Sequence, residues 1–491
     1  MISQILNQNI WWQDKSLISH DPKIREMNAQ RFRWRPPVLE ELDLDHFAVY
    51  TIRGPRQVGK TTALKILIQD LLEDERVLKE QVMYYTCDNI DDYKELIELL
   101  ETYLDHIKKL NLGKKRLYIF LDEVTSVRDW QKGIKYLIDT GRFSQACMVL
   151  TGSNAADLRK GVERLPGRRG KVKSPDKIML PLTFRDYVRL INPGLFTRLA
   201  ERLSGGMDIF TLDQAAFKAL LSLQPHHGEL AILYEQFLIT GGFITAINAY
   251  FPEHEIGYAV YELYQQWFRG DISRAGRSER TARQIINELI TIGVSAFGWD
   301  TIAKKIGVAT HKTVSEYIET MEDSFVLKTL YQIDINTRRS RIKKLKKTYF
   351  LDSFIFWSLW GWVDNWLAYS DNVNRALTSP DIKAKLTEQI IANELFYRFD
   401  RPDWLNSQVF FWKNGGEIDF IIKREKVLLP LEVKYQKNAG FADLRTIKKL
   451  GFKRGILISA DRLDMEEDGF TIIPVELFLL ATGGGDIGGR S

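Results

Sequence analysis

Cysteine is scarce in this chain, and its scarcity excludes several classes of protein. The 491 residues contain two cysteines, Cys87 and Cys147. Two thiols cannot supply the several cross-links of a disulfide-rich scaffold or the ligands of a zinc ribbon. Unpaired thiols are typical of a reducing compartment, so the sequence favours a cytoplasmic protein.

Long apolar runs are also missing. The N-terminal stretch MISQILNQNIWWQDK has no apolar core of signal-peptide length. The most apolar aromatic stretch, FLDSFIFWSLWGWVDNWLAY, contains Asp352 and Asp364, which favour a buried segment of a soluble protein over a membrane span. We therefore expect no membrane association.

A strong excess of one charge sign is absent as well. The formal net charge is +5, with 45% hydrophobic and 27% charged residues, which is an ordinary globular balance. Such a small charge does not by itself indicate a nucleic-acid partner, so the distribution of charge must decide. The chain shows no internal repeat, and its length suggests about three domains.

Changes of pattern along the chain indicate its organisation. From His46 to about residue 190, short apolar runs alternate with helical sequence, as in a parallel α/β sheet. The runs are HFAVYTI, QVMYYTC, RLYIFLD, ACMVLTG and KIMLPL. The expected segments are a lead-in at 1–45, an α/β core at 46–190, a helical lid at 191–275, a winged helix at 276–350, a connector at 351–381, a second α/β domain at 382–480 and a flexible, glycine-rich tail at 481–491.

The first apolar run leads into a complete phosphate-binding loop, GPRQVGKTT, which matches G-x-x-x-x-G-K-[ST]. Its glycines let backbone amides turn toward phosphates, and the following helix adds its dipole. Lys60 is expected to reach the β- and γ-phosphates, and Thr61 to offer its hydroxyl to Mg²⁺. The sequence thus predicts ATP and Mg²⁺ at Gly54, Pro55, Arg56, Gln57, Val58, Gly59, Lys60, Thr61 and Thr62.

A second apolar strand, RLYIFLDEV, ends in two acids that suit the same site. Asp122 is expected to position Mg²⁺, directly or through water, and Glu123 to polarise the attacking water. The next strand, ACMVLTGSN, ends in Ser153 and Asn154, either of which could sense the γ-phosphate. The alternative for that pair is a hydroxyl-rich turn.

A basic segment, LRKGVERLPGRRGKVK, follows these strands. An arginine on it could reach the nucleotide of a neighbouring subunit and stabilise charge in the transition state, which implies a homo-oligomer. The alternative is a solvated basic loop. The candidates are Arg159, Arg164, Arg168 and Arg169.

Residues 281–325 have the pattern helix, helix, turn, helix, with Gly307 at the turn. This is a helix-turn-helix pattern, and the flanking runs FVLKTLYQI and TYFLD suggest a wing. The loop TRRSRIKKLKK between them has seven basic residues, including Lys346 and Lys347, and no acid. We expect sequence-neutral contacts with DNA phosphates, because Glu316 and Glu319 on the presumed recognition helix disfavour base reading. The alternative is a winged helix that only packs between domains. The expected contact residues are Arg338, Arg339, Arg341, Lys343 and Lys344.

The stretch EIDFIIKREKVLLPLEVKY carries charge inside two strand-like runs. Period-two alternation puts Glu432 and Lys434 on one face, and a hairpin would bring Asp419 alongside. Together with Glu388 on the preceding helix, Asp419 and Glu432 could share Mg²⁺ or Mn²⁺. Lys434 could then orient water or stabilise charge on a phosphate. The ranked substitutes are Glu417 and Glu394, and Pro430 predicts an edge strand or a bulge.

Two resemblances to known families follow from these motifs. The order helix, three strands, helix, strand, with the four polar positions named above, resembles the PD-(D/E)XK nuclease fold. GPRQVGKTT, LYIFLDEV, TGSNAADL, LPGRRG and LPLTFRDYV resemble prokaryotic AAA-superfamily ATPases whose C-terminal half was long labelled a domain of unknown function. GGFITA at 241–246, TVSEYIETMEDSFVL, YFLD at 349–352 and EIDF…LEVK extend that resemblance over nearly the whole chain.

The resemblances imply a multidomain α/β protein: a P-loop AAA-type sheet with a helical lid, a winged helix, and a PD-(D/E)XK-like domain. An arginine after the glycine of LPGRRG is characteristic of the ATPase family, which favours Arg168 as the arginine acting between subunits. The predicted function is an ATP-regulated enzyme that cuts duplex or branched DNA with Mg²⁺ or Mn²⁺. The alternative is a nucleotide-driven switch or binding module with a silent nuclease fold.

Overall fold

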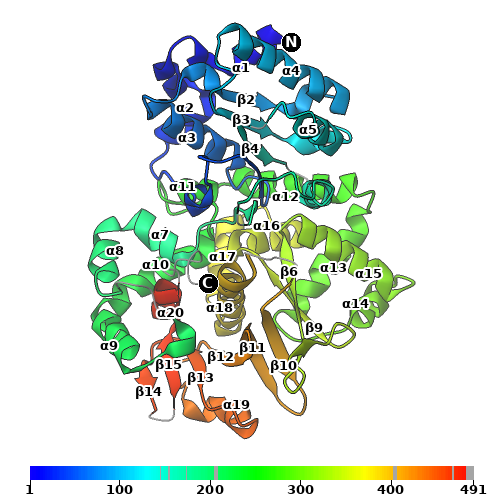
Figure 1. The fold of residues 1–491 in the computed structure, drawn as a ribbon. Coiled ribbons are helices and arrows are strands. Elements are labelled where there is room, and N and C mark those ends of the chain that lie inside the picture. The colour runs from blue at the N-terminus through cyan, green and yellow to red at the C-terminus, as the bar shows by residue number, and fades with distance from the viewer. Residues whose placement is uncertain are drawn as a thin grey trace. The chain divides into compact units, whose positions relative to one another are not determined.

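The computed structural model describes residues 1–143, 145–152, 155–172, 174–203, 208–401, 406–466 and 469–482 (Figure 1). The chain forms two compact units, Met1–Leu180 and Pro181–Ser491. Most of the predicted tail at 481–491 falls outside the described residues.

The first unit is built on a five-stranded parallel sheet in the order β2-β3-β4-β1-β5. All residues of the three central strands are buried, as expected of parallel strands covered on both faces. The five predicted runs are all confirmed as strands: β1 (Ala48–Arg53), β2 (Val82–Thr86), β3 (Leu117–Asp122), β4 (Ala146–Thr151) and β5 (Asp176–Ile178).

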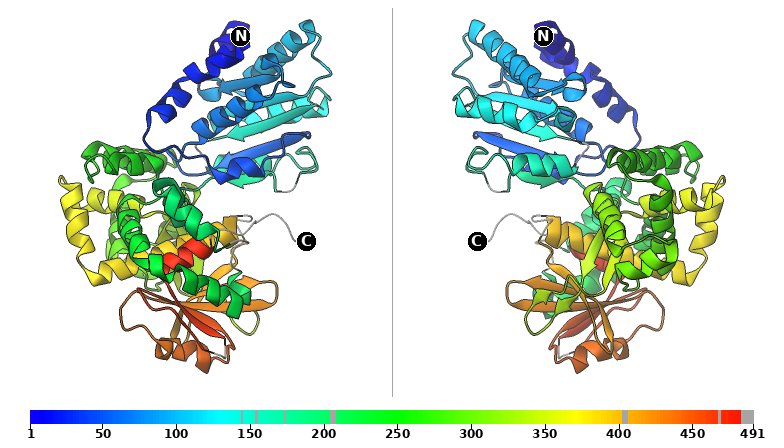
Figure 2. Two further views of the ribbon diagram at one scale, coloured as in Figure 1. Left: turned by 90° about the vertical axis from the view of Figure 1, so that its left-hand side faces the viewer. Right: turned by 90° about the vertical axis from the view of Figure 1, so that its right-hand side faces the viewer.

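Helices cover both faces of this sheet (Figure 2). The connection through α3 (Lys60–Glu73) crosses the sheet in one direction, whereas those through α4 (Tyr93–Lys109) and α5 (Trp130–Asp139) cross it in the other. Because parallel crossovers are right-handed, α3 lies on the face opposite α4 and α5. The carboxyl ends of β1, β3 and β4 therefore meet at one edge, where ligands bind in open α/β sheets.

The lead-in segment packs against the edge strand β2. Asn9 donates to the Tyr84 carbonyl at 2.9 Å and accepts from the Tyr84 amide at 2.7 Å. The indole nitrogens of Trp11 and Trp12 both donate to the Val82 carbonyl, at 3.0 and 2.8 Å. Side chains thus occupy backbone groups that an edge strand would otherwise expose. The segment includes α1 (Ile2–Gln8) and α2 (Pro22–Ala29).

The second unit begins with helices, as predicted for residues 191–275. They are α7 (Phe184–Ile191), α8 (Pro193–Ala200), α9 (Gln214–Leu223), α10 (His227–Thr240), α11 (Ile244–Tyr250) and α12 (Tyr258–Arg274). Two more helices follow in the chain: α16 (Ser353–Asp364) contains most of the aromatic stretch, and α17 (Tyr369–Leu377) begins at its last residue.

The motifs GGFITA and YFLD meet at the start of α16. The side chain of Asp352 caps this helix by accepting from the Phe354 amide at 2.7 Å, and it also accepts from the Gly242 amide at 2.7 Å. A Cβ on Gly241 would lie 2.1 Å from an Asp352 oxygen, and Gly241 has φ +56°. These motif residues therefore serve packing and capping.

Three helices and an antiparallel strand pair occupy the region predicted as a winged helix. The helices are α13 (Glu279–Ile292), α14 (Trp299–Ile306) and α15 (His311–Asp323). Strands β6 (Leu327–Tyr331) and β9 (Lys346–Phe350) pair antiparallel, and a shorter pair, β7 (Ile333–Asp334) with β8 (Arg339–Ser340), lies nearer the tip. Gly307 ends α14 in the left-handed conformation, with φ 71°.

The C-terminal part is a six-stranded mixed sheet in the order β10-β11-β12-β13-β15-β14. The predicted order of helix, three strands, helix and strand is observed. The elements are α18 (Pro380–Leu395), β10 (Val409–Lys413), β11 (Glu417–Arg424), β12 (Val427–Lys434), α19 (Arg445–Lys449), β13 (Gly455–Ser459), β14 (Asp464–Met465), β15 (Phe470–Pro474) and α20 (Val475–Thr482).

Pro430 was predicted to mark an edge strand or a bulge, but β12 is an interior strand and its ladder with β11 continues in register through the proline. Strand β12 lies inside the sheet, antiparallel to β11 and parallel to β13. Its ladder with β13 begins at Leu431, directly after the proline. The missing N–H of Pro430 therefore falls outside that ladder, which makes the proline compatible with an interior strand.

Within the described part of the chain, no single helix has both the length and the apolar character needed to cross a bilayer; one pair bent by 112°, Gln214–Thr240 with Ile244–Tyr250, meets the criterion only when taken together.

Candidate functional site

The phosphate-binding loop lies between β1 and α3, at the carboxyl edge of the first sheet. Gln57 and Gly59 have positive φ values of 62° and 98°, which turn the loop back on itself. A Cβ on Gly54 would lie 2.1 Å from the Met179 carbonyl oxygen, so only glycine fits there. The Lys60 ammonium curls under the loop and donates to the carbonyls of Gly54 and Pro55, at 3.0 and 2.9 Å.

The predicted metal-binding pair is brought together across the sheet. The Thr61 hydroxyl, at the start of α3, donates to Asp122 Oδ2 at 2.7 Å, although 61 residues separate them. Asp122 stands at the end of β3 and is 3% exposed. Its carboxylate also accepts from the hydroxyls of Tyr84 and Thr151, and burial, with the nearby Asp122 charge, raises the pKa of Tyr84.

Glu123 follows directly in a left-handed conformation, with φ 53°. Its amide donates to the Thr151 hydroxyl at 3.2 Å, so the end of β4 fixes the backbone that carries Glu123. A hydroxyl, a carboxylate and a lysine beside a glycine loop are the donor set that suits Mg²⁺ and a nucleoside triphosphate. The predicted sensor residues Ser153 and Asn154 lie outside the described residues.

The doubled arginines of LPGRRG have different surroundings. Arg169 donates to the Val49 carbonyl at 3.0 Å and pairs with Asp176 at 2.7 Å, which ties it to β1 and β5. Arg168 pairs with Asp139 at the end of α5, at 2.6 Å, and keeps 28% of its side chain exposed. The sequence left these two open, and the structure gives Arg169 a packing role.

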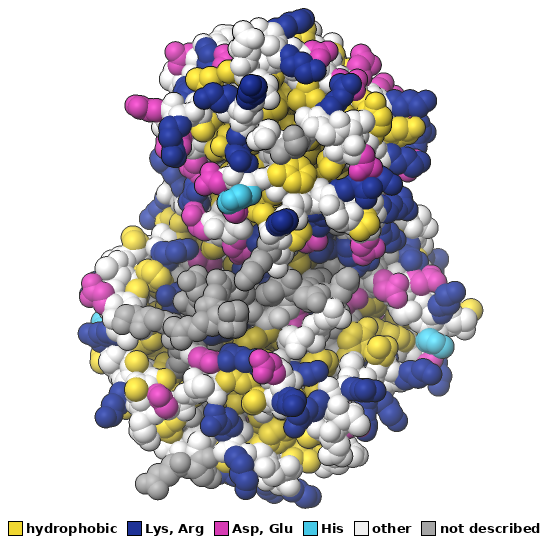
Figure 3. All heavy atoms as spheres, in the orientation of Figure 1, with side chains coloured by type: hydrophobic (Ala, Val, Ile, Leu, Met, Phe, Trp, Pro, Cys, Tyr) yellow, Lys and Arg dark blue, Asp and Glu magenta, His cyan; other side chains and the backbone are white. Residues whose placement is uncertain are grey.

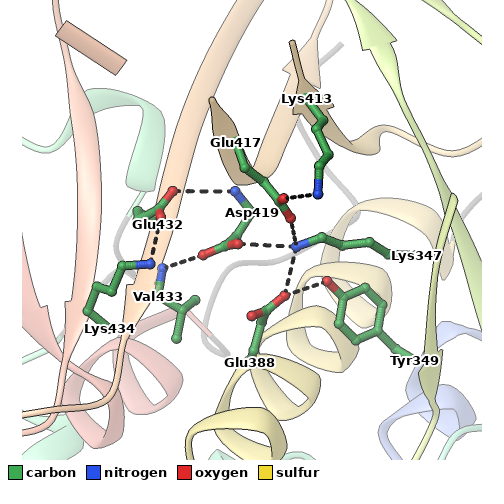
Figure 4. Close-up of polar contacts among 9 residues, drawn as sticks. All are labelled: Lys347, Tyr349, Glu388, Lys413, Glu417, Asp419, Glu432, Val433 and Lys434. Carbon is green, nitrogen blue, oxygen red and sulfur yellow. Dashed lines mark hydrogen bonds and ion pairs between the residues drawn. The ribbon is translucent and has the colours of Figure 1, made fainter. Parts of the chain in front are cut away.

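The four polar residues predicted for the C-terminal site do gather at one place (Figure 4). Asp419 on β11 accepts from the Val433 amide at 3.0 Å through Oδ2. Glu432 on β12 accepts from the Asp419 amide at 3.4 Å and from Lys434 Nζ at 2.8 Å. Glu388 of α18 faces the same cluster, so the predicted hairpin and helix contributions are both observed.

A fifth residue, Lys347 of β9, occupies the middle of this cluster. Its ammonium lies 3.0 Å from Glu388 Oε1, 2.9 Å from Glu417 Oε1 and 3.1 Å from Asp419 Oδ1, and the residue is 1% exposed (Figure 4). Tyr349, two residues along the strand, donates to Glu388 at 2.8 Å. Glu417, ranked as a substitute acid, therefore belongs to the cluster, paired also with Lys413 at 2.7 Å.

These residues do not fit a divalent cation as they stand. The Lys347 ammonium lies within 3.1 Å of carboxylate oxygens of Glu388, Glu417 and Asp419. Among the residues that the structure describes, no group of three or more His, Cys, Asp or Glu side chains is placed to hold a metal ion. The assignment of Glu388, Asp419 and Glu432 as metal ligands stays a prediction, because Lys347 is already paired with Glu388 and Asp419, and Lys434 with Glu432.

Burial and like charge shift the titration of this cluster. Burial, then the neighbouring Asp419, raises the pKa of Glu388 to about 7 and that of Glu432 to about 8. Burial opposes the charged form of Lys347, yet Tyr349, Glu388, Asp419 and Glu417 raise the pKa of Lys347 well above its ordinary value. Lys347 is therefore charged at neutral pH.

Glu394, the other ranked substitute, lies apart from this cluster. It accepts from the Thr482 hydroxyl at 3.3 Å, and burial raises the pKa of Glu394 to about 7. Its surroundings include Arg398 and Arg185 rather than the cluster lysines.

The basic loop was predicted with seven cationic residues, and the structure divides them. Lys346 and Lys347 lie on β9 and are buried, at 7% and 1% exposure, so neither can meet a phosphate on the surface. Arg341 is held by Asp334, with Nε 3.0 Å from Oδ2. The exposed cations of the tip are Arg338, Arg339, Arg341, Lys343 and Lys344.

Sequence reasoning missed Lys347, Tyr349, Tyr84 and Thr151. One signal was available for the first two: positions 347 and 349 point to the same side of a strand, and a lysine and a tyrosine on a buried face need polar partners. Nothing local pointed to Tyr84 or Thr151, whose partner Asp122 is on a different strand.

Three family models match parts of the chain. Residues 46–188 match the family described as an AAA domain. Residues 232–365 and 383–478 match two domains of unknown function, DUF8612 and DUF4143. The first match, with the complete phosphate loop, confirms a P-loop ATPase domain of the AAA class, for which ATP and Mg²⁺ are the usual ligands. None of these descriptions names a nuclease, so that assignment stays a prediction.

Relatives along the whole chain are distant. The uncharacterized protein MJ1637 of Methanocaldococcus jannaschii is 22% identical over 469 residues, 92% of this chain and 90% of that protein. An uncharacterized protein of Haemophilus influenzae is 23% identical over 466 residues, 90% of this chain and 96% of that protein.

Solved structures show only a loose likeness. The Walker-type ATPase PABY2304 of Pyrococcus abyssi has a TM-score of 0.39 at 12% identity, covering 70% of this chain and 97% of that one. The Aeropyrum pernix ORC1 protein in complex with DNA has a TM-score of 0.27 at 13% identity, covering 75% and 98%. At these scores the likeness carries no argument about function.

Proposed function

We propose that the chain is an ATP-hydrolysing molecular switch whose second unit binds DNA without cutting it. The observation that carries this proposal is the contrast between a phosphate loop with its Thr61–Asp122 pair and an acidic cluster whose centre holds Lys347. The first arrangement suits nucleotide chemistry. The second leaves its carboxylates with an internal counter-ion.

In the ATPase domain each residue has a distinct role. Lys60 leaves its loop carbonyls to bind the phosphates, while Thr61 and Asp122 would hold Mg²⁺, which offsets phosphate charge when bound. Glu123 orients and polarises the attacking water. Asp122 keeps its orientation through Tyr84 and Thr151.

DNA binding is assigned to a winged helix formed by α13, α14, α15 and the β6–β9 hairpin. Its exposed tip cations would contact backbone phosphates, which gives affinity without sequence preference. Glu316 on α15 is paired with Arg277 at 3.4 Å, so it repels a phosphate less than its sequence suggests. On the face that Figure 3 shows, Lys and Arg are interspersed with Asp and Glu, so a local contact is favoured over a broad basic surface.

Assembly into a homo-oligomer is part of the proposal. Arg168 is the candidate for acting between subunits, because Arg169 is tied to its own sheet. Arg168 would exchange Asp139 for the charge of a neighbouring nucleotide. Buried thiols at Cys87 and Cys147 fit a reducing, cytoplasmic setting, and burial raises the pKa of Cys147 to about 12.

A metal-dependent nuclease is the second candidate. It is favoured by the gathering of Glu388, Asp419, Glu432 and Lys434 in the predicted order of elements. It requires Lys347 to leave the cluster first, and therefore ranks below the switch.

One set of measurements separates the two candidates. DNA affinity is measured for the full chain without nucleotide, with ADP, and for Glu123→Gln with ATP, while labelled DNA is checked for cleavage with Mg²⁺ and Mn²⁺. The switch predicts affinity that differs several-fold between nucleotide states and no cleavage, with Lys60→Ala fixed in the nucleotide-free behaviour. Equal affinity in all states would contradict the switch. Cleavage that Asp419→Asn abolishes would put the nuclease first.

A further inference from the structure

We propose that Lys347 is the resident cation of the acidic cluster, standing where a divalent ion would bind, so that the chain creates a metal site there only when Lys347 is removed. This inference rests on the proposed function, which already places Lys347 at the centre of the cluster, and adds what the cluster can bind once Lys347 is removed.

The ammonium of Lys347 is surrounded by carboxylates. An ammonium group has three N–H donors and no acceptor. Three carboxylates, those of Glu388, Glu417 and Asp419, lie between 2.9 and 3.1 Å from the nitrogen. The ammonium donates hydrogen bonds to Glu388 Oε1 and Asp419 Oδ1 and forms an ion pair with Glu417. Mg²⁺ needs its oxygens at about 2.0–2.1 Å, so a metal and the ammonium cannot share this space.

The hairpin that carries Lys347 is anchored against the same domain. Lys347 pairs with Leu330 in the β6–β9 ladder, and Lys328 on β6 reaches Asp400 at 3.0 Å. Gln332, just past β6, donates to the Lys413 carbonyl of β10 at 2.5 Å. Ile333 belongs to the hydrophobic core of the C-terminal sheet. Lys347 thus enters the cluster on a strand whose partner, β6, is anchored to the C-terminal domain.

Several other oxygens of the cluster have partners as well. Asp419 Oδ2 accepts from the Val433 amide, Glu417 Oε2 pairs with Lys413, and Glu432 pairs with Lys434. Glu388 Oε1 receives Tyr349 in addition to Lys347. A divalent ion would have to displace Lys347 to find three carboxylates together. Lysine and metal are therefore mutually exclusive occupants.

The test counts Mn²⁺ bound to the nucleotide-free full chain, from the loss of the free-ion electron paramagnetic resonance signal. Lys347→Met keeps the length of the side chain and removes its charge. We expect this variant to gain one Mn²⁺ site at least tenfold tighter than any in the wild type. The triple variant Lys347→Met/Glu388→Gln/Asp419→Asn should lack this additional site. Lys328→Met is the matched control, a buried lysine of the same hairpin whose partner is Asp400, and it should gain no site.

Two outcomes overturn the inference. One is wild-type Mn²⁺ binding as tight as that of Lys347→Met and lost in Glu388→Gln/Asp419→Asn. The other is a folded Lys347→Met chain that binds no additional Mn²⁺. If Lys347→Met folds only when Mn²⁺ is present, that dependence supports the inference. The melting temperature of the wild type is an independent check, and we expect Mn²⁺ to leave it unchanged. Failure here leaves the switch testable, because nucleotide-dependent DNA affinity is measured separately.

Discussion

The two acidic sites of this chain were predicted from similar signals, yet they differ in what faces the carboxylates. At the first, Asp122 is held by hydroxyls from Thr61, Tyr84 and Thr151, which are neutral and leave its charge available to a cation. At the second, Glu388, Glu417 and Asp419 face the ammonium of Lys347. An acidic motif therefore indicates a metal site only when no cation of the protein neutralises it.

The largest expected effect is on ATP turnover at the first site, the phosphate-binding loop with Asp122. Lys60→Ala removes the charge that binds phosphate, so ATP turnover should fall by roughly 10²–10³-fold, the scale seen when one donor to developing charge is removed. Glu123→Gln should reduce turnover on a similar scale while still binding ATP, since it serves only the water. Turnover is measured by phosphate release, and affinity with a fluorescent nucleotide.

Glu432→Gln is the control for both, because it changes an acid of the second unit and should leave turnover intact. ATP turnover by Glu123→Gln at the wild-type rate would show that Glu123 is not the residue that activates water.

Removing the Lys347 ammonium from the second site should strongly destabilise the second unit. Lys347→Ala leaves the buried carboxylates of Glu388 and Asp419, and the half-buried one of Glu417, without their counter-ion, and breaking a buried ion pair costs about 3–5 kcal/mol. The free energy of unfolding of the second unit, followed in urea, should fall by that amount. Lys343→Ala at the exposed tip should change it by less than about 0.5 kcal/mol. Equal stability of the two variants would mean that Lys347 contributes nothing as a counter-ion.

The sequence predicted the strands and helices far better than it predicted the pairing of Lys347 with the carboxylates. The apolar runs and the glycine loop are local signals, and all five parallel strands appeared where expected. The carboxylates also met as predicted, because strand alternation and a hairpin suffice to bring Glu432 and Asp419 together. Lys347 was counted with the loop cations, since its partners lie 41, 70 and 72 residues away and only the docking of β9 brings them to it.

A smaller effect concerns pH. The folded pKa of Glu432 is raised from an ordinary 4.5 to about 8 by burial and Asp419, so the folded state keeps a proton that the unfolded state has lost. Between those values, stability falls as pH rises, by at most about 1.4 kcal/mol per pH unit for one group. Glu432→Gln removes this group, so its melting temperature relative to wild type should rise from pH 5 to pH 8. Lys434 keeps its charge over this range. A difference independent of pH would contradict the raised pKa.

The smallest expected effect concerns DNA binding by the cations at the tip of the β6–β9 hairpin, which are exposed, whereas Lys347 of the same hairpin is buried. Lys343 and Lys344 are exposed, whereas Arg341 of the same tip is held by Asp334. Lys343→Ala/Lys344→Ala should weaken binding to duplex DNA several-fold, whatever its sequence, and lower the slope of log affinity against log salt by roughly one per lost phosphate contact. Lys114→Ala/Lys115→Ala in the first unit is the control of equal charge, because both lysines are exposed and no DNA contact is assigned to them. The loss of DNA affinity in Arg341→Ala should lie between the losses in these two double variants, because Arg341 is already paired with Asp334. If both double variants have the same salt slope, the DNA contact lies elsewhere. The hairpin would then have only its structural role, which is to hold Lys347 beside the carboxylates of Glu388, Glu417 and Asp419.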